Sequence, residues 1–312
     1  MRVLFFGTSD FAVPSLERLA ESPRHGVIAV VTQPDRPHGR GLRLQQSPVK
    51  RAALARGLPV LQPRRVRSPR FLEKARELRP DALALAAFGQ IIPQELLDLP
   101  PFGPVNLHAS LLPAYRGAAP IQHALLNGDT VTGVTTMWMD ATLDTGDILL
   151  ARQVPIEPED DAGTLTEKLG RLGADLLLET LDLLEEGRCP RTPQDHSRAT
   201  SAPAIGQDDA RIRWEEPPRR IVGRVRAMAP RPGAFVSLGG RRVKVWRASE
   251  PQGLPAPGEP GTVAAVTREG VVVAAEGGAV VLEEVQPESG RRMPAADWAR
   301  GARLAPGTRF DS

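Results

Sequence analysis

Residues 1–20, MRVLFFGTSDFAVPSLERLA, decide the class of fold. A short apolar run at residues 2–6 ends in Gly-Thr-Ser-Asp, which predicts a turn, and an amphipathic stretch follows at residues 11–20. A short strand that is apolar on both faces, followed by a helix, is typical of a parallel sheet covered by helices on both sides. We therefore expect the chain to begin as a strand and a helix, and not as a signal peptide, whose apolar stretch would be longer.

The same alternation of apolar runs and helical patterns continues to residue 186. Further predicted strands lie at residues 27–32, 82–87, 105–108, 134–139 and 148–154. Predicted helices lie at residues 48–56, 69–78, 93–97 and 165–186. We therefore predict that residues 1–188 form a Rossmann-like α/β domain around a parallel sheet.

The pattern changes after residue 188. Residues 189–206 have no apolar period and are rich in proline, serine and threonine, which is typical of a linker. Short β-forming runs then follow, with Gly-Gly pairs between neighbours as hairpins require. They lie at residues 233–238, 242–247, 262–267, 270–275 and 279–286, with helical patterns at 217–228 and 294–299. Residues 207–312 are therefore predicted to form a compact OB-like β-barrel of five strands.

The composition argues against a membrane protein or a disulfide-stabilised one. The 312 residues are 41% hydrophobic and 25% charged, as in soluble globular proteins, and charge or proline interrupts every apolar run before it could span a bilayer. A single cysteine, Cys189, leaves no internal disulfide and suits a reducing compartment. We expect a cytoplasmic protein without a membrane partner.

Positive charge is concentrated in one part of the chain, although the net charge is only +3. Residues 36–79 contain thirteen lysine and arginine residues and two acidic ones, whereas residues 140–186 are strongly acidic. Scattered arginines are compatible with simple solvated faces. A local basic excess beside an active site favours a polyanionic partner instead.

The stretch VNLHASLLPAYRGAAPIQ at residues 105–122 places an amide and an imidazole at the end of a predicted strand. Asn106 and His108 share one face because side chains two apart in a strand point the same way. Open parallel sheets bind ligands at the carboxyl ends of their strands. The amide can donate to a developing oxyanion, and the imidazole can bind the same oxygen or move a proton. Since Ser110 has no evident base and Cys189 lies in the linker, this site is suited to direct attack of one substrate on another.

An acidic segment, DATLDTGD at residues 140–147, follows another predicted strand. Its carboxylates are therefore expected at the same edge of the sheet, where one of them would orient His108 and raise its basicity. The simpler alternatives are a strand-end histidine with a capping asparagine, and a polar turn. A metal loop is disfavoured because the aspartate spacing misses the calcium template and no histidine pair is present. We therefore expect no metal.

Two motifs carry a family resemblance. NLHASLLPAYRG at residues 106–117, followed by LDTGD at 143–147, resembles the folate-dependent formyltransferases. FGTSDFA at 6–12, TQPDRPHGRGLR at 32–43 and SPVK at 47–50 extend the resemblance across the chain, and are most similar to the members that formylate methionyl-tRNA. Trp138 and Thr142 depart from the pattern, where a polar and a small residue are expected.

The resemblance implies a set of site residues. Asn106, His108 and Asp144 would form the catalytic set. The folate pocket would include Phe88, Gly89, Gln90, Ser110, Leu111, Leu112, Pro113 and Asp140. Residues 32–50 match a loop that engages tRNA, and helical or hairpin arginines of the second domain would grip phosphates without reading sequence. The expected tRNA-binding residues are Arg36, Arg40, Arg43, Lys50, Arg220, Arg224, Arg242 and Lys244.

The implied reaction transfers the formyl group of 10-formyltetrahydrofolate to the α-amino group of initiator methionyl-tRNA, for translation initiation. Folate and this tRNA are the expected partners, and a monomer is the expected state. A glycinamide ribonucleotide or nucleotide-sugar formyltransferase would share the catalytic set, but would not explain both the basic insertion and the second domain. A non-catalytic RNA-binding protein is a further alternative, although an aromatic content of 4% offers few stacking platforms. A nicotinamide dehydrogenase is poorly supported because Gly7-Thr-Ser-Asp lacks the dinucleotide-binding spacing.

Overall fold

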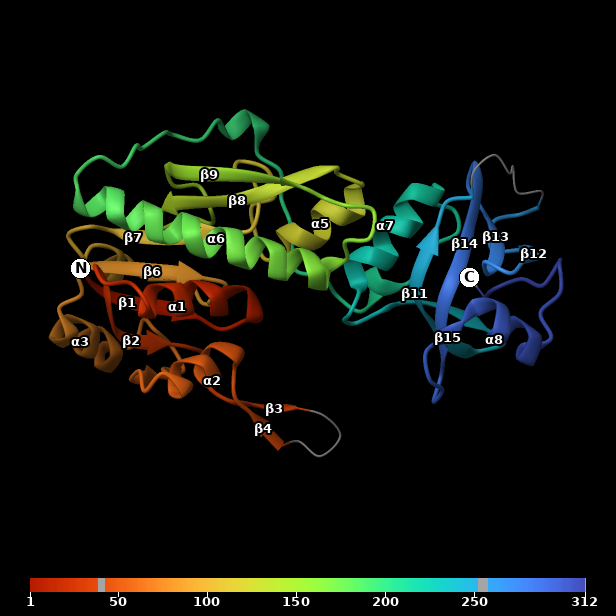
Figure 1. Ribbon diagram of the computed structural model, residues 1–312, viewed down its shortest axis with the longest axis horizontal. Coiled ribbons are helices and arrows are strands. Elements are labelled where there is room, and N and C mark those ends of the chain that lie inside the picture. Colours follow the sequence, from red (N-terminus) through yellow and green to blue (C-terminus); the bar gives the residue numbers. More distant parts are fainter. Residues whose placement is uncertain (39–42, 252–257, 312) are drawn as a thin grey trace. The chain divides into compact units, whose positions relative to one another are not determined.

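The computed structural model describes residues 1–38, 43–251 and 258–311, which divide into two compact units (Figure 1). The N-terminal unit comprises Met1–Pro120, Val131–Pro155 and Thr166–Pro203, and the C-terminal unit comprises Ile121–Thr130, Ile156–Leu165 and the chain from Ala204 onward. None of the described helices is both long and apolar enough to cross a membrane.

This division differs from the two continuous domains expected from the sequence, because two short inner segments belong to the C-terminal unit. The first contains most of α5 (Pro120–Asn127), and α7 (Pro218–Met228) holds both segments by hydrogen bonds. Arg220 donates to the Asn127 side chain at 3.2 Å, and Arg226 donates to the carbonyl oxygens of Asp160 and Glu157, each at 2.6 Å.

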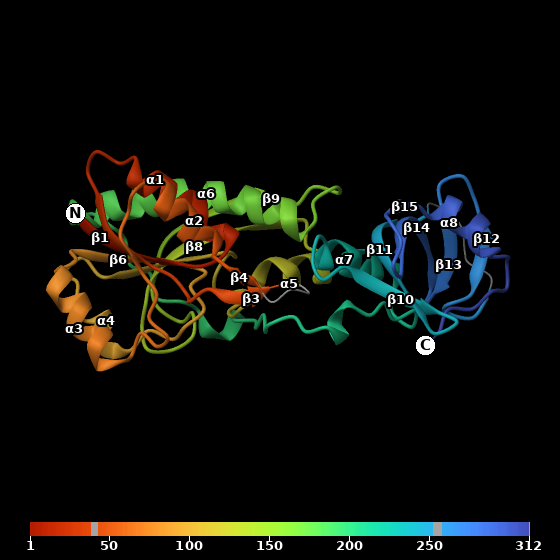
Figure 2. The same ribbon diagram turned by 90° about the horizontal axis from the view of Figure 1, so that it is seen from below.

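The N-terminal unit contains a sheet of order β5-β2-β1-β6-β7-β8-β9, which confirms the predicted α/β class. Its strands are β1 (Arg2–Gly7), β2 (Gly26–Val31), β5 (Val60–Leu61), β6 (Ala82–Ala86), β7 (Pro104–His108), β8 (Val131–Trp138) and β9 (Ile148–Pro155). Its helices are α1 (Val13–Ala20), α2 (Pro48–Ala55), α3 (Pro69–Leu78), α4 (Gln94–Leu97) and most of α6 (Ala162–Glu185). Figure 2 shows α1 and α6 on one face of the sheet and α3 and α4 on the other.

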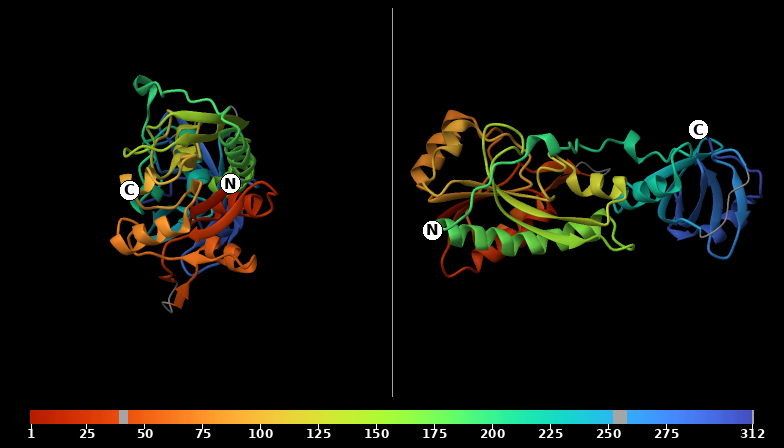
Figure 3. Two further views of the ribbon diagram at one scale, coloured as in Figure 1. Left: turned by 90° about the vertical axis from the view of Figure 1, so that its left-hand side faces the viewer. Right: turned by 90° about the horizontal axis from the view of Figure 1, so that it is seen from above.

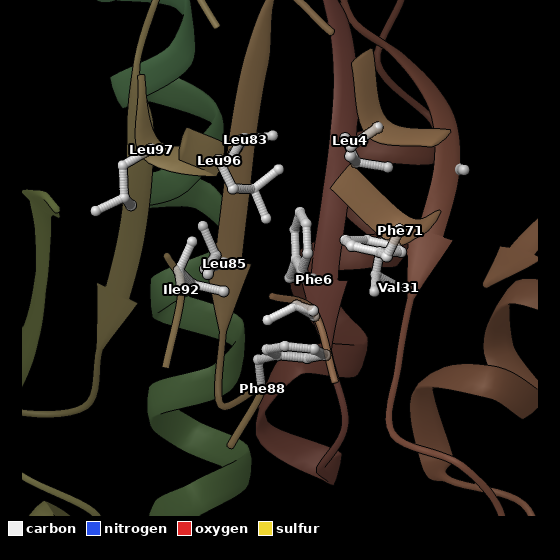
Figure 4. Close-up of a cluster of buried hydrophobic side chains, with 13 residues drawn as sticks. Leu4, Phe6, Val31, Phe71, Leu83, Leu85, Phe88, Ile92, Leu96 and Leu97 are labelled. Carbon is white, nitrogen blue, oxygen red and sulfur yellow. The ribbon is translucent and has the colours of Figure 1, made fainter. Parts of the chain in front are cut away.

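The central strands are buried on both faces, as their apolar runs predict. All five residues of β6 are buried, and so are the last five of β1. Figure 4 shows the core on the α3 and α4 side, where Phe6 lies edge-on to Phe71 and Phe88 with ring centroids 6.4 and 5.3 Å apart. This packing fixes the carboxyl ends of β1 and β6, from which the loops around the site emerge.

Strand β8 runs antiparallel to β7 and to the rest of the sheet, contrary to the all-parallel prediction, and β9 pairs antiparallel with β8. His108 of β7 lies opposite Thr135 of β8, and Val105 lies opposite Trp138. The end of β8 therefore lies beside the start of β7, so the premise that the acidic segment leaves from the carboxyl edge is wrong. An apolar run does not show strand direction, and α/β sheets commonly carry antiparallel strands at one edge.

Part of the predicted basic loop forms a hairpin outside the main sheet. Strands β3 (Arg36–His38) and β4 (Arg43–Gln45) pair antiparallel, with Arg36 opposite Gln45. Arg40 lies outside the described residues. The base of the hairpin follows β2, so it starts from the carboxyl edge of the sheet.

The C-terminal unit contains an antiparallel sheet of order β10-β11-β14-β13-β12, with the short β15 paired to β14. The strands are β10 (Ala234–Leu238), β11 (Arg241–Ser249), β12 (Val263–Val266), β13 (Val271–Ala275), β14 (Gly278–Pro287) and β15 (Met293–Pro294). The five longer strands match the predicted runs. Helix α8 (Ala295–Ala302) and α7 complete the unit.

The last described residues join the two edges of this sheet. Asp311 pairs with Ser237 of β10, while Arg309 pairs with Thr262, the residue before β12. The carboxylate of Asp311 also accepts the backbone N–H groups of Gly239 and Gly240 in the β10–β11 turn. Phe310 is buried between the rings of Trp214 and Trp298, at 5.5 and 6.3 Å.

Candidate active site

Strand β7 presents Asn106 and His108 on one face at the carboxyl edge of the parallel strands. Asn106 is half-buried and aligned with Leu85 of β6, and its amide makes no hydrogen bond to any described residue. His108 is 6% exposed. Strand β7 thus holds an amide donor that has no partner among the described residues beside an almost buried imidazole.

The two ring nitrogens of His108 have different neighbours. Nε2 lies 2.8 Å from the carbonyl oxygen of Tyr115. Since a carbonyl only accepts, Nε2 carries a proton and donates to it. Nδ1 faces Oδ2 of Asp144 at 3.7 Å, which is longer than a hydrogen bond. Nδ1 is therefore the ring nitrogen that remains for a reacting group, and a carboxylate lies beside it.

Asp144 is fixed by its own loop and by the loop after β7. It is 8% exposed, its φ is +54°, and its Oδ2 accepts the backbone N–H of Gly117 at 2.9 Å. Gly117 has φ +124°, and a Cβ there would lie 2.6 Å from the carbonyl oxygen of Ala202. Only glycine therefore lets this N–H reach the carboxylate.

The acidic loop folds back on itself, which brings Asp144 to His108 despite the direction of β8. Trp138 N–H donates to the carbonyl of Asp147 at 2.9 Å, and Met139 N–H donates to that of Pro104 at 2.9 Å. A Cβ at Gly146 would lie 1.7 Å from the carbonyl oxygen of Trp138, so a glycine is needed for this tight return. Asp144 thus lies beside His108, as expected from the sequence, although the strand direction assumed for that expectation is wrong.

The predicted linker packs as a wall against the loops that carry Tyr115 and Asp144. Figure 3 (right) shows residues 188–203 as an extended green segment that runs back along the N-terminal unit from the end of α6. Thr192 exchanges two backbone hydrogen bonds with Ile148, at 2.8 and 2.9 Å. Thr200 accepts the N–H of Tyr115 on its hydroxyl at 2.8 Å, and Ala202 N–H donates to the carbonyl of Arg116 at 2.7 Å. Sequence reasoning missed this wall because ordered segments without regular structure have no apolar period.

The Ser-Leu-Leu-Pro turn is held by its own serine and by β8. Ser110 is fully buried, and its hydroxyl donates to the carbonyl of Ala114 at 2.6 Å. Thr135 donates to the carbonyl of Ser110 at 2.7 Å and accepts the N–H of Leu112 at 3.1 Å. The Ser110 hydroxyl is therefore engaged in structure, in keeping with a site that has no serine nucleophile. The turn presents Leu111 and Pro113, both half-buried.

The predicted pocket residues after β6 make hydrogen bonds within the protein. Phe88 is part of the core, and its carbonyl accepts from Thr8 at 2.9 Å and from Gln33 at 3.0 Å. Gln33 also donates to the carbonyl of Gly89 at 3.0 Å. The Gln90 side chain accepts the backbone N–H of Val66 at 3.0 Å, so it holds a neighbouring loop.

Asp140 lies at the exposed end of the acidic loop. Burial acts to raise the pKa of Asp140. The pKa is nevertheless below its ordinary value, because Thr142 and Thr145 donate hydrogen bonds to the carboxylate and Arg116 adds a nearby positive charge. Thr142, a departure from the family pattern, thus anchors a carboxylate that stays ionised at neutral pH. The other departure, Trp138, carries the guanidinium of Arg191 over its ring at 4.2 Å.

One histidine–carboxylate group elsewhere has the donor types of a metal site: His25, Asp182 and Glu185. It lies before β2, at the opposite edge of the sheet, and Arg24 already pairs with Asp182 at 3.1 Å and with Glu185 at 3.0 Å. Burial, together with the neighbouring N-terminal ammonium, lowers the pKa of His25. Within the described part of the chain, no such group includes His108.

Of the four predicted tRNA-binding residues near the hairpin, Lys50 is engaged within the protein. Its side chain is 15% exposed and donates to Asp35 at 2.7 Å and to Gln62 at 2.8 Å. Lys50 therefore braces the base of the hairpin rather than offering a free charge. Arg36 is exposed and hydrogen-bonds Gln33, and Arg43 begins β4.

Of the four predicted tRNA-binding residues in the C-terminal unit, Arg224 is the one that is buried. It is 4% exposed, donates to both carboxylate oxygens of Glu216 at 2.6 Å, and donates to the carbonyl of Asp209 at 2.6 Å. Its expected phosphate contact is therefore wrong for this conformation. The helical spacing of the arginines does not show which one faces the core.

Arg242 and Lys244 line a groove of about 580 Å³ beside β11 and β14. The Arg242 guanidinium lies 4.0 Å from the centre of the Phe235 ring, and Lys244 donates to the carbonyl of Pro232 at 2.6 Å. Arg292 covers the ring of Trp246 at 3.7 Å, which sequence reasoning did not single out. Arg220 is exposed on α7.

Comparisons with known proteins agree with these observations. Residues 1–181 match the family model described as formyl transferase, and residues 204–303 match the formyl transferase C-terminal domain. A Geobacter sulfurreducens protein named methionyl-tRNA formyltransferase is 47% identical, over 99% of this chain and 96% of that protein. A protein of the same name from Syntrophus aciditrophicus is 48% identical, over 98% of this chain and 97% of its own length.

Solved structures support the fold at lower identity. Methionyl-tRNA formyltransferase from Clostridium thermocellum has a TM-score of 0.56 and 17% identity, over 81% of this chain and 95% of that one. An N-formyltransferase from Helicobacter canadensis, in complex with folinic acid and dTDP-3-aminofucose, has a TM-score of 0.67 and 19% identity, over 92% of this chain and 100% of that one.

Proposed function

This chain belongs to the formyl transferase family in both of its parts, and we propose that it transfers the formyl group of 10-formyltetrahydrofolate to the α-amino group of initiator methionyl-tRNA. The observation that carries this proposal is the placement of Asn106 and His108 at the end of β7, with the Asp144 carboxylate 3.7 Å from Nδ1 of His108. The names of relatives that share nearly half of its residues support the choice of acceptor.

The proposed chemistry follows from the atoms that are available. Asn106 donates its amide N–H to the formyl oxygen as that oxygen gains charge during attack. Nδ1 of His108 accepts the proton that the attacking α-amino group loses, while the Asp144 carboxylate stabilises the imidazolium. When the bond between the formyl carbon and the folate nitrogen breaks, the same proton moves from Nδ1 to that nitrogen. The proton lost by the acceptor is thus gained by the leaving group.

A direct assay tests the proposal. The purified protein is incubated with 10-formyltetrahydrofolate and charged initiator tRNA, and formylmethionine is released and quantified. Parallel reactions contain a nucleotide amino sugar or glycinamide ribonucleotide as the acceptor. We expect formylation of the tRNA alone, and efficient formylation of either small acceptor in its place would reject the proposal.

We expect transfer to persist after prolonged EDTA treatment of the protein. The reason is that the one imidazole, one amide and one carboxylate of the proposed site each act on a proton or on the oxyanion, and they are not the ligand set of a zinc site. The measurement is the initial rate after EDTA is removed, with magnesium restored to the tRNA in every reaction. Loss of activity that one particular ion restores to the protein would contradict this expectation.

Arg40→Ala is expected to raise the KM for tRNA by about tenfold, as for loss of one charge-assisted hydrogen bond. We propose that the hairpin residues contact the acceptor end, because the hairpin starts from the same sheet edge as the site. Lys74→Ala, which removes a cation from α3 that pairs with Glu77, is the matched control. Equal loss of folate affinity in the Arg40 variant would show that the hairpin builds the folate pocket instead.

A further inference from the structure

Gln194 is a buried side chain in the wall formed by residues 188–203, and it uses all its polar atoms. It is 6% exposed. Its amide nitrogen donates to the carbonyl oxygens of Asp144 and Gly146, at 2.9 and 2.7 Å. Its oxygen accepts from the guanidinium of Arg116, at 3.1 Å from Nε and 2.6 Å from Nη2. A buried amide that is fully satisfied in this way fixes the groups around it.

These partners belong to the two loops that enclose His108. Asp144 and Gly146 lie in the acidic loop, whereas Arg116 follows Tyr115, whose carbonyl accepts from His108. Gln194 therefore bridges the loop that carries the carboxylate and the loop that holds the imidazole. Gly117 adds the other link between them, by donating to the Asp144 carboxylate.

The conformation of Asp144 explains why such a bridge is needed. Its φ of +54° lies in the left-handed region, which aspartate tolerates but does not favour, so contacts to its backbone help to keep the loop in this conformation. The Gln194 amide binds the carbonyl of Asp144 itself and the carbonyl two residues later. It thereby fixes the backbone on both sides of the turn that aims the carboxylate at His108.

We propose that Gln194 is a positioning residue for formyl transfer, which holds Asp144 opposite Nδ1 of His108. This inference rests on the proposed function. Gln194 acts through the backbone of Asp144 and needs two N–H groups to do so. A glutamate in its place keeps the acceptor for Arg116 but has no N–H for the two carbonyls.

The alternative is that Gln194 only attaches the wall to the N-terminal unit. Other hydrogen bonds already do this on both sides of Gln194. Thr192 pairs with Ile148, and Ala202 pairs with Arg116, entirely through backbone groups. A variant at Gln194 therefore leaves the wall attached and tests the bridge itself.

The experiment compares Gln194→Ala and Gln194→Glu with Thr192→Ala, whose side chain is exposed in the same wall. We expect kcat to fall by about 100-fold in both Gln194 variants, as for a displacement of a catalytic group by about 1 Å. The KM values for tRNA and folate should stay close to those of the unmodified chain, because the Gln194 side chain is buried and its polar atoms are bound to protein groups. Hydrogen exchange in residues 140–147 should accelerate in both variants, and Thr192→Ala should change none of these quantities.

Each result decides between the two roles. Normal kcat in Gln194→Glu would overturn the proposal, since the two lost donors would then be unimportant. A parallel loss in kcat and in both affinities, with a lower Tm in Gln194→Ala, would show a purely structural role. Absence of formyl transfer by the unmodified chain would reject the proposed function, whereas normal turnover in both Gln194 variants would reject the bridge alone.

Discussion

His108→Ala is expected to lower kcat by about 10²- to 10⁴-fold, the usual range for loss of a general acid–base group. The imidazole is the group proposed to carry the proton from the attacking amine to the leaving nitrogen, and the Asp144 carboxylate lies 3.7 Å from its Nδ1. Single-turnover formylation measures the effect without the contribution of product release. Asn106→Ala is expected to lose about 10²- to 10³-fold, because it removes one donor to the oxyanion.

A second buried histidine provides the matched control. His25 is 3% exposed but lies at the opposite edge of the same sheet, where its ring contacts Asp182 at 3.1 Å. His25→Gln is expected to keep normal turnover while it lowers stability. Turnover close to that of the unmodified chain in a folded His108→Ala protein would reject the catalytic assignment.

Arg224→Ala is expected to lower the free energy of unfolding of the C-terminal unit by about 3–5 kcal/mol, the cost of breaking a buried ion pair from one side. The partner, Glu216, is only 20% exposed and would keep its charge without a counter-ion. Urea unfolding followed by tryptophan fluorescence measures this, because three of the four tryptophans, at positions 214, 246 and 298, lie in the C-terminal unit.

Arg219→Ala is the matched control, because Arg219 lies on the same helix and is exposed. Its effect on unfolding should stay within about 0.5 kcal/mol, as for ordinary surface positions. Binding of tRNA to the folded Arg224 variant should be unchanged. If Arg224→Ala instead leaves stability intact and weakens tRNA binding, the arginine contacts phosphate after all.

The part of the site on β7 can be predicted because local patterns determine it. An apolar run before Asn106 and His108 predicts the strand, and their spacing of two residues places both side chains on one face. The parallel order of β1, β6 and β7 follows from strands that alternate with helices. These inferences need only the sequence around each residue.

The rest of the site depends on contacts between distant segments. Gln194 touches residues 116, 144 and 146, which no local pattern connects to it. The acidic loop reaches His108 only because it folds back from an antiparallel strand. The sequence of an arginine-rich helix likewise does not show that Arg224 is buried, because its burial depends on where Glu216 and Asp209 lie.

The closure of the C-terminal sheet by residues 308–311 has a consequence for how this chain behaves in a crowded solution. A strand at the border of a sheet exposes a row of unpaired backbone groups, which can template the addition of a strand from another molecule. Asp311 bonds to Ser237 on one border and Thr308 to Val263 on the other, both at 2.8 Å. The backbone of residues 308–311 thus occupies positions at which a strand from another molecule would pair. This protects the sheet from aggregation at both borders.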